Sequence, residues 1–218
     1  MGFEVLASSD RLFARYSLRS SCKLMDYAKL EDMAQPNVYR IQRGQVLLAH
    51  PLLEDHNFQQ SVILLADHDT QGTVGFVLND PTEYLLPDAL EGSWPSLPLH
   101  VGGPVDHDSL FYVHCRPDLI PGSHSIDGFL YWGGEYDAMR EALQSGQLQA
   151  GHIRFFAGYS GWSPQQLYQE IDEGSWAVIP GNTVNCLSYQ ADLYQTLKGH
   201  LPPDFRLWSN APKEPHLN

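Results

Sequence analysis

Short apolar runs, separated by glycine, proline and acidic residues, dominate the pattern of this sequence. Runs of roughly four to eight aliphatic, β-branched and aromatic residues with such boundaries are typical of buried β-strands. They predict strands at 45–49, 61–67, 73–79, 110–114, 128–132 and 152–157. Only Asp69-Thr70-Gln71-Gly72 joins the second of these strands to the third, so we expect these two strands to form an antiparallel hairpin.

Signals for helix ends occur in the second half of the chain. The segment Ser163-Pro164-Gln165-Gln166 has the composition of a helix start. The Ser163 hydroxyl can accept a hydrogen bond from the backbone N–H of Gln166, and the Gln166 side chain can reach back in a capping box. Gly174 then ends this helix. Two further helices are predicted at 136–144, before Gly146, and at 189–198, before Gly199.

Strands and helices alternate irregularly, which favours an α+β (mixed α/β) fold over a doubly wound parallel sheet. The 218 residues suit one domain with an appendage. We expect a partly helical N-terminal arm at 1–37, which ends at Gln35-Pro36-Asn37, and a single globular domain at 38–218. The proline-rich residues 82–98 and residues 159–162 are expected to be loops.

The arm carries basic residues at every fourth position, which form one stripe if the arm is helical. This stripe could bind an anion or nucleic acid, or it could be a solvated face that docks on the acidic surface of the same chain. Four charges are a small footprint for nucleic acid, which favours the second interpretation. The residues of the stripe are Arg11, Arg15, Arg19 and Lys23.

The net charge is −13 at pH 7, and the segment from Gly44 to Cys115 contains ten acidic residues and no Lys or Arg. A DNA-binding surface needs a basic face, so we expect no direct binding of nucleic acid by the domain. The apolar runs are far shorter than the roughly 20 residues that span a bilayer, and the N-terminus lacks the apolar region of a secretory signal. These features predict a cytoplasmic protein that makes no contact with a membrane.

Two Asp-His-Asp triplets, centred on His68 and His107, raise the question of a metal site. Successive side chains of a strand point to opposite faces, so one triplet cannot surround an ion, and only the fold could bring the two together. The three cysteines are scattered and form no C-x-x-C pair. No phosphate-binding loop or dinucleotide fingerprint occurs. We therefore expect no metal and no cofactor.

The segment Gly158-Tyr159-Ser160-Gly161-Trp162 has some features of a nucleophile elbow. An elbow needs glycine two positions after the serine, where this chain has Trp162, so Ser160 is not expected to be a nucleophile. Two interpretations remain for the glycines before the predicted helix. They could expose N–H groups that bind an anion, or they could permit close packing, and we favour packing.

The signature residues of a known family are spread in three ordered groups over about 40–180. The first group comprises Gly44-Gln45-Val46-Leu47-Leu48-Ala49 with Pro51, Asp55 and Phe58, then Ser61-Val62-Ile63-Leu64-Leu65, His68, Gly72, Gly75 and Asn79. The second is Gly102-Gly103-Pro104-Val105, and the third is residues 158–162 with Gln166, Leu167 and Glu170. Together they resemble the YqgE/AlgH family. The resemblance implies a bacterial, cytoplasmic protein with a bifurcated, largely antiparallel sheet flanked by helices, in a family labelled as a transcriptional regulator.

Two positions depart from the family pattern. Asp80 stands where members usually have Lys or Arg, which puts any role of that positive charge in doubt. Ser160 stands where members commonly have alanine, which argues further against a nucleophilic role.

We expect a non-enzymatic binding or regulatory protein that acts through a protein or small-molecule partner. The alternative is an enzyme that uses His68 or His107 with nearby carboxylates for acid–base chemistry; it lacks an identifiable nucleophile. The same residues that mark the candidate binding surface could instead serve only to maintain the fold. That surface comprises His68, Asn79, Gly102, Gly103, Pro104, Gly158, Tyr159, Gly161 and Trp162.

The charge distribution yields a first testable prediction. Residues 38–218 should not retain random duplex DNA in a filter-binding or gel-shift assay, because the acidic surface repels phosphates. Sub-micromolar binding that weakens with added salt would contradict this prediction.

Overall fold

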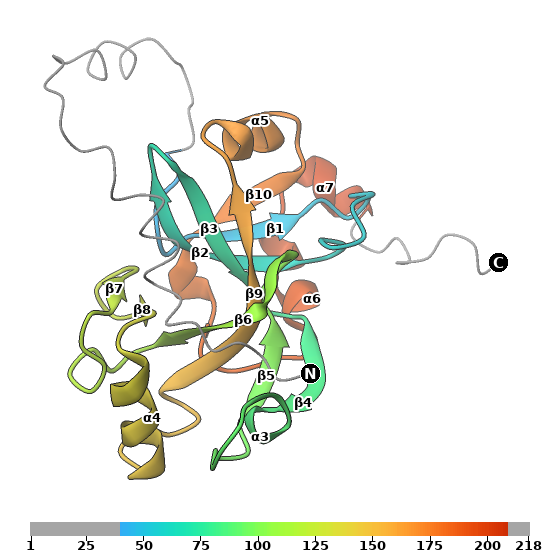
Figure 1. Ribbon diagram of the computed structural model, residues 1–218. Helices are drawn as coiled ribbons and strands as arrows, with labels where there is room; N and C mark the ends of the chain where they lie inside the picture. The colour runs from blue at the N-terminus through green and yellow to red at the C-terminus, as the bar shows by residue number, and fades with distance from the viewer. Residues whose placement is uncertain (1–39, 209–218) are drawn as a thin grey trace, which may run out of the picture.

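The computed structural model describes residues 40–208, and the predicted N-terminal arm and basic stripe lie outside this range (Figure 1). Within residues 40–208, ten strands form one branched sheet in which only the β5–β9 pair is parallel. This arrangement confirms the α+β fold with a largely antiparallel sheet. The strands are β1 Val46–Ala49, β2 Val62–Asp69, β3 Gly72–Val77, β4 Pro81–Leu85, β5 Pro98–Val101, β6 Val105–His114, β7 His124–Ser125, β8 Tyr131–Trp132, β9 Ile153–Trp162 and β10 Trp176–Ile179.

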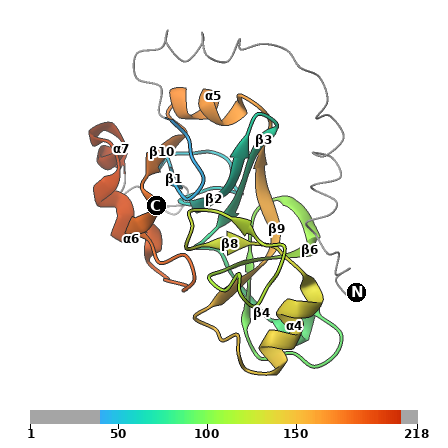
Figure 2. The ribbon, with the colours of Figure 1, turned by 90° about the vertical axis from the view of Figure 1, so that its left-hand side faces the viewer.

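The described helices are short and lie around the sheet. They are α3 Leu86–Ala89, α4 Tyr136–Gln144, α5 Gln166–Asp172, α6 Leu193–Leu197 and α7 Pro203–Trp208, with 3₁₀ turns at Gly181–Thr183 and Lys198–His200. In Figure 2, α6 and α7 lie on one side of the molecule, with α5 and α4 at its two ends. The predicted helix at 136–144 is confirmed, whereas the helix predicted at 189–198 begins only at Leu193.

Strand β9 is the point at which the sheet branches. The order of the main path is β10-β1-β2-β3-β9-β6-β8-β7, and β5 also pairs with β9 and carries β4 at its outer edge. Residues 155–157 of β9 pair with β5, and residues 160–162 pair with β3. The backbone N–H of Val77 donates to the carbonyl of Gly102 (2.9 Å), which joins the ends of β3 and β5. Strands β3 and β5 therefore share one edge of β9, while β6 occupies the other.

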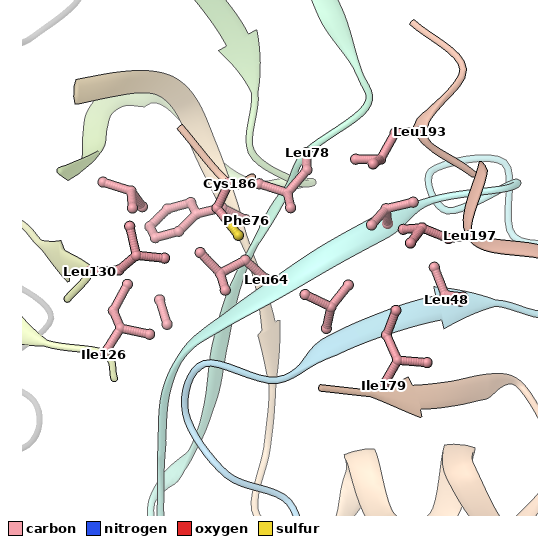
Figure 3. Packing of buried hydrophobic residues seen from close by; sticks show 14 of the residues in the cluster. Leu48, Leu64, Phe76, Leu78, Ile126, Leu130, Ile179, Cys186, Leu193 and Leu197 are labelled. Carbon is pink, nitrogen blue, oxygen red and sulfur yellow. The ribbon is translucent and has the colours of Figure 1, made fainter. Parts of the chain in front are cut away.

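Three apolar clusters stabilise this sheet. The first packs Leu193 and Leu197 of α6 against Leu48 and Leu64 of the sheet (Figure 3). The second lies between α3, α4 and the β5–β9–β6 region. The third packs Leu167 of α5 against the opposite face of β1 and β2. Alternate residues of the buried strands face different clusters, as the period of a strand requires.

The loop predicted at 82–98 is correct only for residues 90–97, and the loop predicted at 159–162 is wrong. Residues 82–98 contain most of β4 and the whole of α3, because β4 pairs with β5, where the Thr82 hydroxyl donates to the carbonyl of Leu99 (2.6 Å). Residues 159–162 belong to β9, because Gly161 and Trp162 pair with β3. In both places the partner strand is distant in the sequence, so local turn residues gave no sign of it.

The helix start predicted at Ser163 is only half correct. The Gln166 side chain reaches back and accepts from the backbone N–H of Ser163 (3.0 Å), as a capping box requires. The Ser163 hydroxyl, however, donates to the same Gln166 oxygen (3.1 Å) and caps no N–H. The helix begins at Gln166 after Gln165, whose backbone is left-handed at φ 69°.

Glycines permit the close contact of strands at the branch. A Cβ on Gly102 would overlap the carbonyl oxygen of Gly158, and a Cβ on Gly103 would overlap the backbone and side chain of Ser160. Gly158 itself has φ +70°, and its Cβ would lie 2.7 Å from the carbonyl oxygen of Val105. Gly161 has no such constraint, since the nearest atom to its Cβ is a ring carbon of Tyr159. The packing interpretation therefore fits Gly158 and not Gly161.

A single carboxylate fixes α5 to the sheet. Oε2 of Glu170 accepts from the indole N–H of Trp162 on β9 (2.8 Å) and from that of Trp176 on β10 (2.7 Å). Its Oε1 accepts from Nε2 of Gln166 (2.9 Å). Both indoles are buried, so these hydrogen bonds satisfy donors that water cannot reach.

The branch geometry predicts opposite results for two alanine substitutions. Gly158→Ala should lower the free energy of unfolding by about 3 kcal/mol or more, because left-handed strain adds to a backbone overlap. Gly161→Ala is the matched control and should change it by less than about 1 kcal/mol. Denaturant unfolding measures both values, and equal destabilisation by the two variants would contradict the prediction.

The role of Glu170 predicts a second stability difference. Glu170→Ala should destabilise the fold by about 2–4 kcal/mol, because it leaves two buried indole N–H groups without acceptors. Glu173→Ala, an exposed change at the end of the same helix, should stay within about 0.5 kcal/mol of the wild type. Thermal or denaturant unfolding of the pair provides the comparison. A near-native midpoint for Glu170→Ala would show that other contacts hold α5.

Candidate functional site

A polar pocket lies where the β2–β3 hairpin approaches the start of α5. Its volume is about 620 Å³. Arg40 and Arg43 from the segment before β1 form one wall, and residues 163–165 before α5 form another. Ile126 and Leu167, both buried, contribute apolar surface. The pocket thus combines charged rims with an apolar base, as small-molecule sites commonly do.

His68 is held in this pocket by hydroxyl groups at both of its ring nitrogens. Nδ1 lies 2.8 Å from the Thr73 hydroxyl, and Nε2 lies 3.3 Å from the Tyr168 hydroxyl. Thr73 faces His68 across the hairpin, and Tyr168 comes from α5. The Tyr168 ring also packs edge-on against the imidazole, with 5.8 Å between centroids. These contacts fix the orientation of the His68 ring.

Opposing charges surround His68. Burial lowers the pKa of His68, the nearby carboxylates of Asp69 and Asp67 raise it, and Arg43 lowers it further. Arg43 lies 3.6 Å from Asp67 in an ion pair at the rim. The lowered pKa favours a neutral imidazole at pH 7, in which one nitrogen donates and the other accepts. The site therefore offers neutral hydrogen-bonding groups, with charges of both signs around them.

The pocket wall before α5 contains a strained residue. Gln165 has φ 69°, a left-handed backbone conformation that residues other than glycine rarely adopt. Its carbonyl accepts the N–H of Gln169 in the first turn of the helix (3.1 Å). Strained residues persist only where the surrounding structure holds them in place, and they occur often at ligand-binding sites.

The structure places the other residues of the sequence-based candidate surface outside the lining of the pocket at His68. Asn79 lies beyond the opposite end of the hairpin, about 20 Å away by the rise of the strand. There its side chain accepts from the N–H of Val62 and donates to the carbonyl of Gln60, both at 2.8 Å. Asp80 follows it, exposed, and its carbonyl accepts the N–H of Val101 (3.0 Å). Both residues contribute to the ends of the strands.

The remaining candidates gather along β9 rather than around a pocket. Gly102, Gly103 and Gly158 form the crowded branch, with Pro104 half-buried beside it. Ser160 is fully buried and donates to the carbonyl of Gly102 (3.1 Å). Tyr159 packs edge-on against Phe111, with 5.4 Å between ring centroids. Gly161 is exposed, and the indole of Trp162 donates a hydrogen bond to Glu170. A binding role for these residues stays a prediction; of the nine, His68 lines the pocket.

The two Asp-His-Asp triplets do not meet. His68 lies in β2 and the exposed His107 lies in β6, three strands further along the sheet, so strand spacing alone separates them by about 14 Å. Among residues 40–208, no three His, Cys, Asp or Glu side chains are grouped so that they could hold a metal ion. Within the same range, no helix has the length and apolar character to cross a bilayer.

Sequence reasoning missed several residues of the pocket. Thr73 could have been found, because the short turn at Asp69–Gly72 places it opposite His68 in the hairpin. Tyr168 could not, because it is 100 residues from His68 and only the packing of α5 brings them together. Gln165 gave no signal either, since its unusual backbone depends on how β9 leads into α5.

Comparison with known proteins agrees with this architecture. A UPF0301 protein of Parabacteroides distasonis is 36% identical over 199 residues, which cover 89% of this chain and all of that protein. One from Chlorobium luteolum is 37% identical over 182 residues, covering 82% and 96%.

Two solved structures are similar. The solution structure of AlgH from Pseudomonas aeruginosa has a TM-score of 0.55 at 27% identity and covers 81% of this chain and 90% of its own. The crystal structure of protein DIP2367 from Corynebacterium diphtheriae has a TM-score of 0.63 at 23% sequence identity. The match covers 85% of this chain and the whole of the DIP2367 chain, and it shows that the two proteins share a fold. The AlgH-like family model matches residues 46–206. This chain therefore belongs to the AlgH-like family.

Proposed function

We propose that this protein is a non-enzymatic binding protein that receives a polar small molecule, or a polar segment of a partner protein, in the pocket at His68. The observation that carries the proposal is the fixed imidazole between the Thr73 and Tyr168 hydroxyls in the wall of that pocket. Oriented hydroxyl and imidazole groups recognise a ligand by hydrogen bonds, and the pocket volume of about 620 Å³ suits a small molecule.

The same contacts argue for binding over catalysis. Both nitrogens of His68 are engaged by hydroxyls, which restrains the ring from acting as a free general base. Enzymatic acid–base chemistry at the Thr73–His68 pair is the second candidate, because their separation of 2.8 Å matches that of a nucleophile and its base.

A regulatory role in the cytoplasm fits this proposal. The thiols of Cys115 and Cys186 are free, as is usual in a reducing compartment. The acidic composition supports a partner other than nucleic acid, so any effect on transcription would pass through a protein or a small molecule.

A screen of ligands by thermal shift tests the proposal. A ligand present at about 100 times its dissociation constant stabilises the fold by roughly 2.7 kcal/mol, which is several degrees in melting temperature for this chain length. We expect polar metabolites that stabilise the wild type to lose most of this effect with His68→Gln and with Tyr168→Phe. His107→Gln, an exposed change on β6, is the control and should leave the shift intact.

Two outcomes would contradict the proposal. Ligands whose effect is the same in the wild type and in both pocket variants would place binding elsewhere. Mass spectrometry would show whether the wild type converts a stabilising ligand to a product. Conversion that His68→Gln abolishes would favour enzymatic acid–base chemistry over binding.

A further inference from the structure

A second, smaller hollow lies at the opposite end of β9 from the His68 pocket. Its volume is about 290 Å³. It is bounded by the start of β5, by the turn that leads into β9 at Ala150 and Gly151, and by residues 187–189. Most of its wall is apolar, with Leu97, Ile153 and Leu187 among the lining residues. Arg154, the second residue of β9, also lines it.

Arg154 is a buried cation with no carboxylate partner among residues 40–208. It is 3% exposed, and its hydrogen-bond acceptors are backbone carbonyls. Nη1 donates to the carbonyls of Cys186 (3.3 Å) and Ser188 (3.4 Å), and Nη2 donates to that of Leu78 (2.6 Å). Burial lowers the pKa of Arg154 to about 10, so the side chain remains charged at pH 7. A buried charge without a counter-ion is costly, and a bound anion would reduce that cost.

The Arg154 guanidinium retains N–H groups beyond those that bond the three backbone carbonyls. Nε–H has no acceptor in the structure, and Nη2 carries a second N–H beyond the one given to Leu78. Arg116 of the same protein uses these two nitrogens to grip Asp118, from Nε to Oδ1 at 2.8 Å and from Nη2 to Oδ2 at 2.7 Å. Paired parallel hydrogen bonds of this kind are the strongest that a guanidinium makes with a carboxylate.

His100 and Tyr189 provide further polar groups in the hollow. Nδ1 of His100 lies 3.3 Å from the carbonyl of Phe155 and is therefore the protonated nitrogen of the neutral ring. Burial and then Arg154 lower the pKa of His100 to about 4, so this ring adds no second cation at pH 7. Tyr189 is 42% exposed, and its ring lies 5.7 Å from that of His100.

We propose that this hollow is a binding site for a small organic carboxylate, with the acid group on Arg154 and an apolar body against the apolar part of the wall. The guanidinium of Arg154 supplies one positive charge, and the neutral imidazole of His100 adds none, so the hollow suits an anion with a single negative charge. Phosphate, which at pH 7 is a mixture of monoanion and dianion, would need more donors for its oxygens and would leave the apolar wall unused. The site is separate from the His68 pocket, so either proposal can fail without the other.

Titration of the full chain with hexanoate tests this inference by NMR. Hexanoate should shift the Nε–H resonance of Arg154 and saturate with a dissociation constant near or below about 1 mM. Hexanamide, which has the same shape without the charge, should leave that resonance in place. Inorganic phosphate should bind at least about tenfold more weakly than hexanoate.

Variants at the rim keep the test independent of folding. Arg154→Lys should abolish the response to hexanoate, but it also removes contacts to three carbonyls. Ala150→Glu leaves Arg154 intact and places a competing carboxylate at the exposed rim. It should weaken hexanoate binding about tenfold or more, whereas Ala150→Gln should change it less than about threefold. Equal responses to hexanoate and hexanamide, tighter binding of phosphate, or no response up to about 20 mM hexanoate would overturn the inference.

Discussion

The sharing of β9 by three strands is the constraint on which the rest of this structure depends. One edge of β9 pairs with β5 and then with β3, and the other pairs with β6. Backbones can converge in this way only where one of the two facing residues has no side chain, which is why Gly102 lies against Gly158 and Gly103 against Ser160 at the branch. Positive φ at Gly158 lets the strand continue past the crowded point. The sheet can therefore divide without losing its hydrogen bonds.

Each end of β9 supports one of the two pockets. At its C-terminal end, Trp162 holds Glu170, which fixes α5 so that Tyr168 reaches His68. At its N-terminal end, Arg154 ties β9 to the carbonyls of Leu78 and Cys186. The polar groups of both pockets are thus linked to β9, Arg154 directly and Tyr168 through α5. Such rigid support keeps donors and acceptors oriented before a ligand arrives.

The residues that carry the family resemblance have physical roles in this arrangement. The glycines of the second group and the Gly-Tyr-Ser-Gly-Trp segment form the branch, and Glu170 connects the branch to α5. Asn79 completes the backbone hydrogen bonds of β2 by accepting from Val62. These roles explain the resemblance through the fold alone, and of the residues named for it only His68, Gly72 and Leu167 line the larger pocket.

The sequence by itself determined most of the buried strands, though not β5 or β10, together with the β2–β3 hairpin and helix α4, because each depends on periodicity and turn residues within a short segment. The short turn of this hairpin also implies that Thr73 lies opposite His68. Only the tertiary structure decided that residues 159–162 are strand and that Tyr168 meets His68, since both depend on segments far apart in the sequence. Arg154 shows the same division. Residue 154 lies within the strand predicted at 152–157, but the lack of a carboxylate beside its guanidinium follows from which backbone carbonyls the fold brings around it.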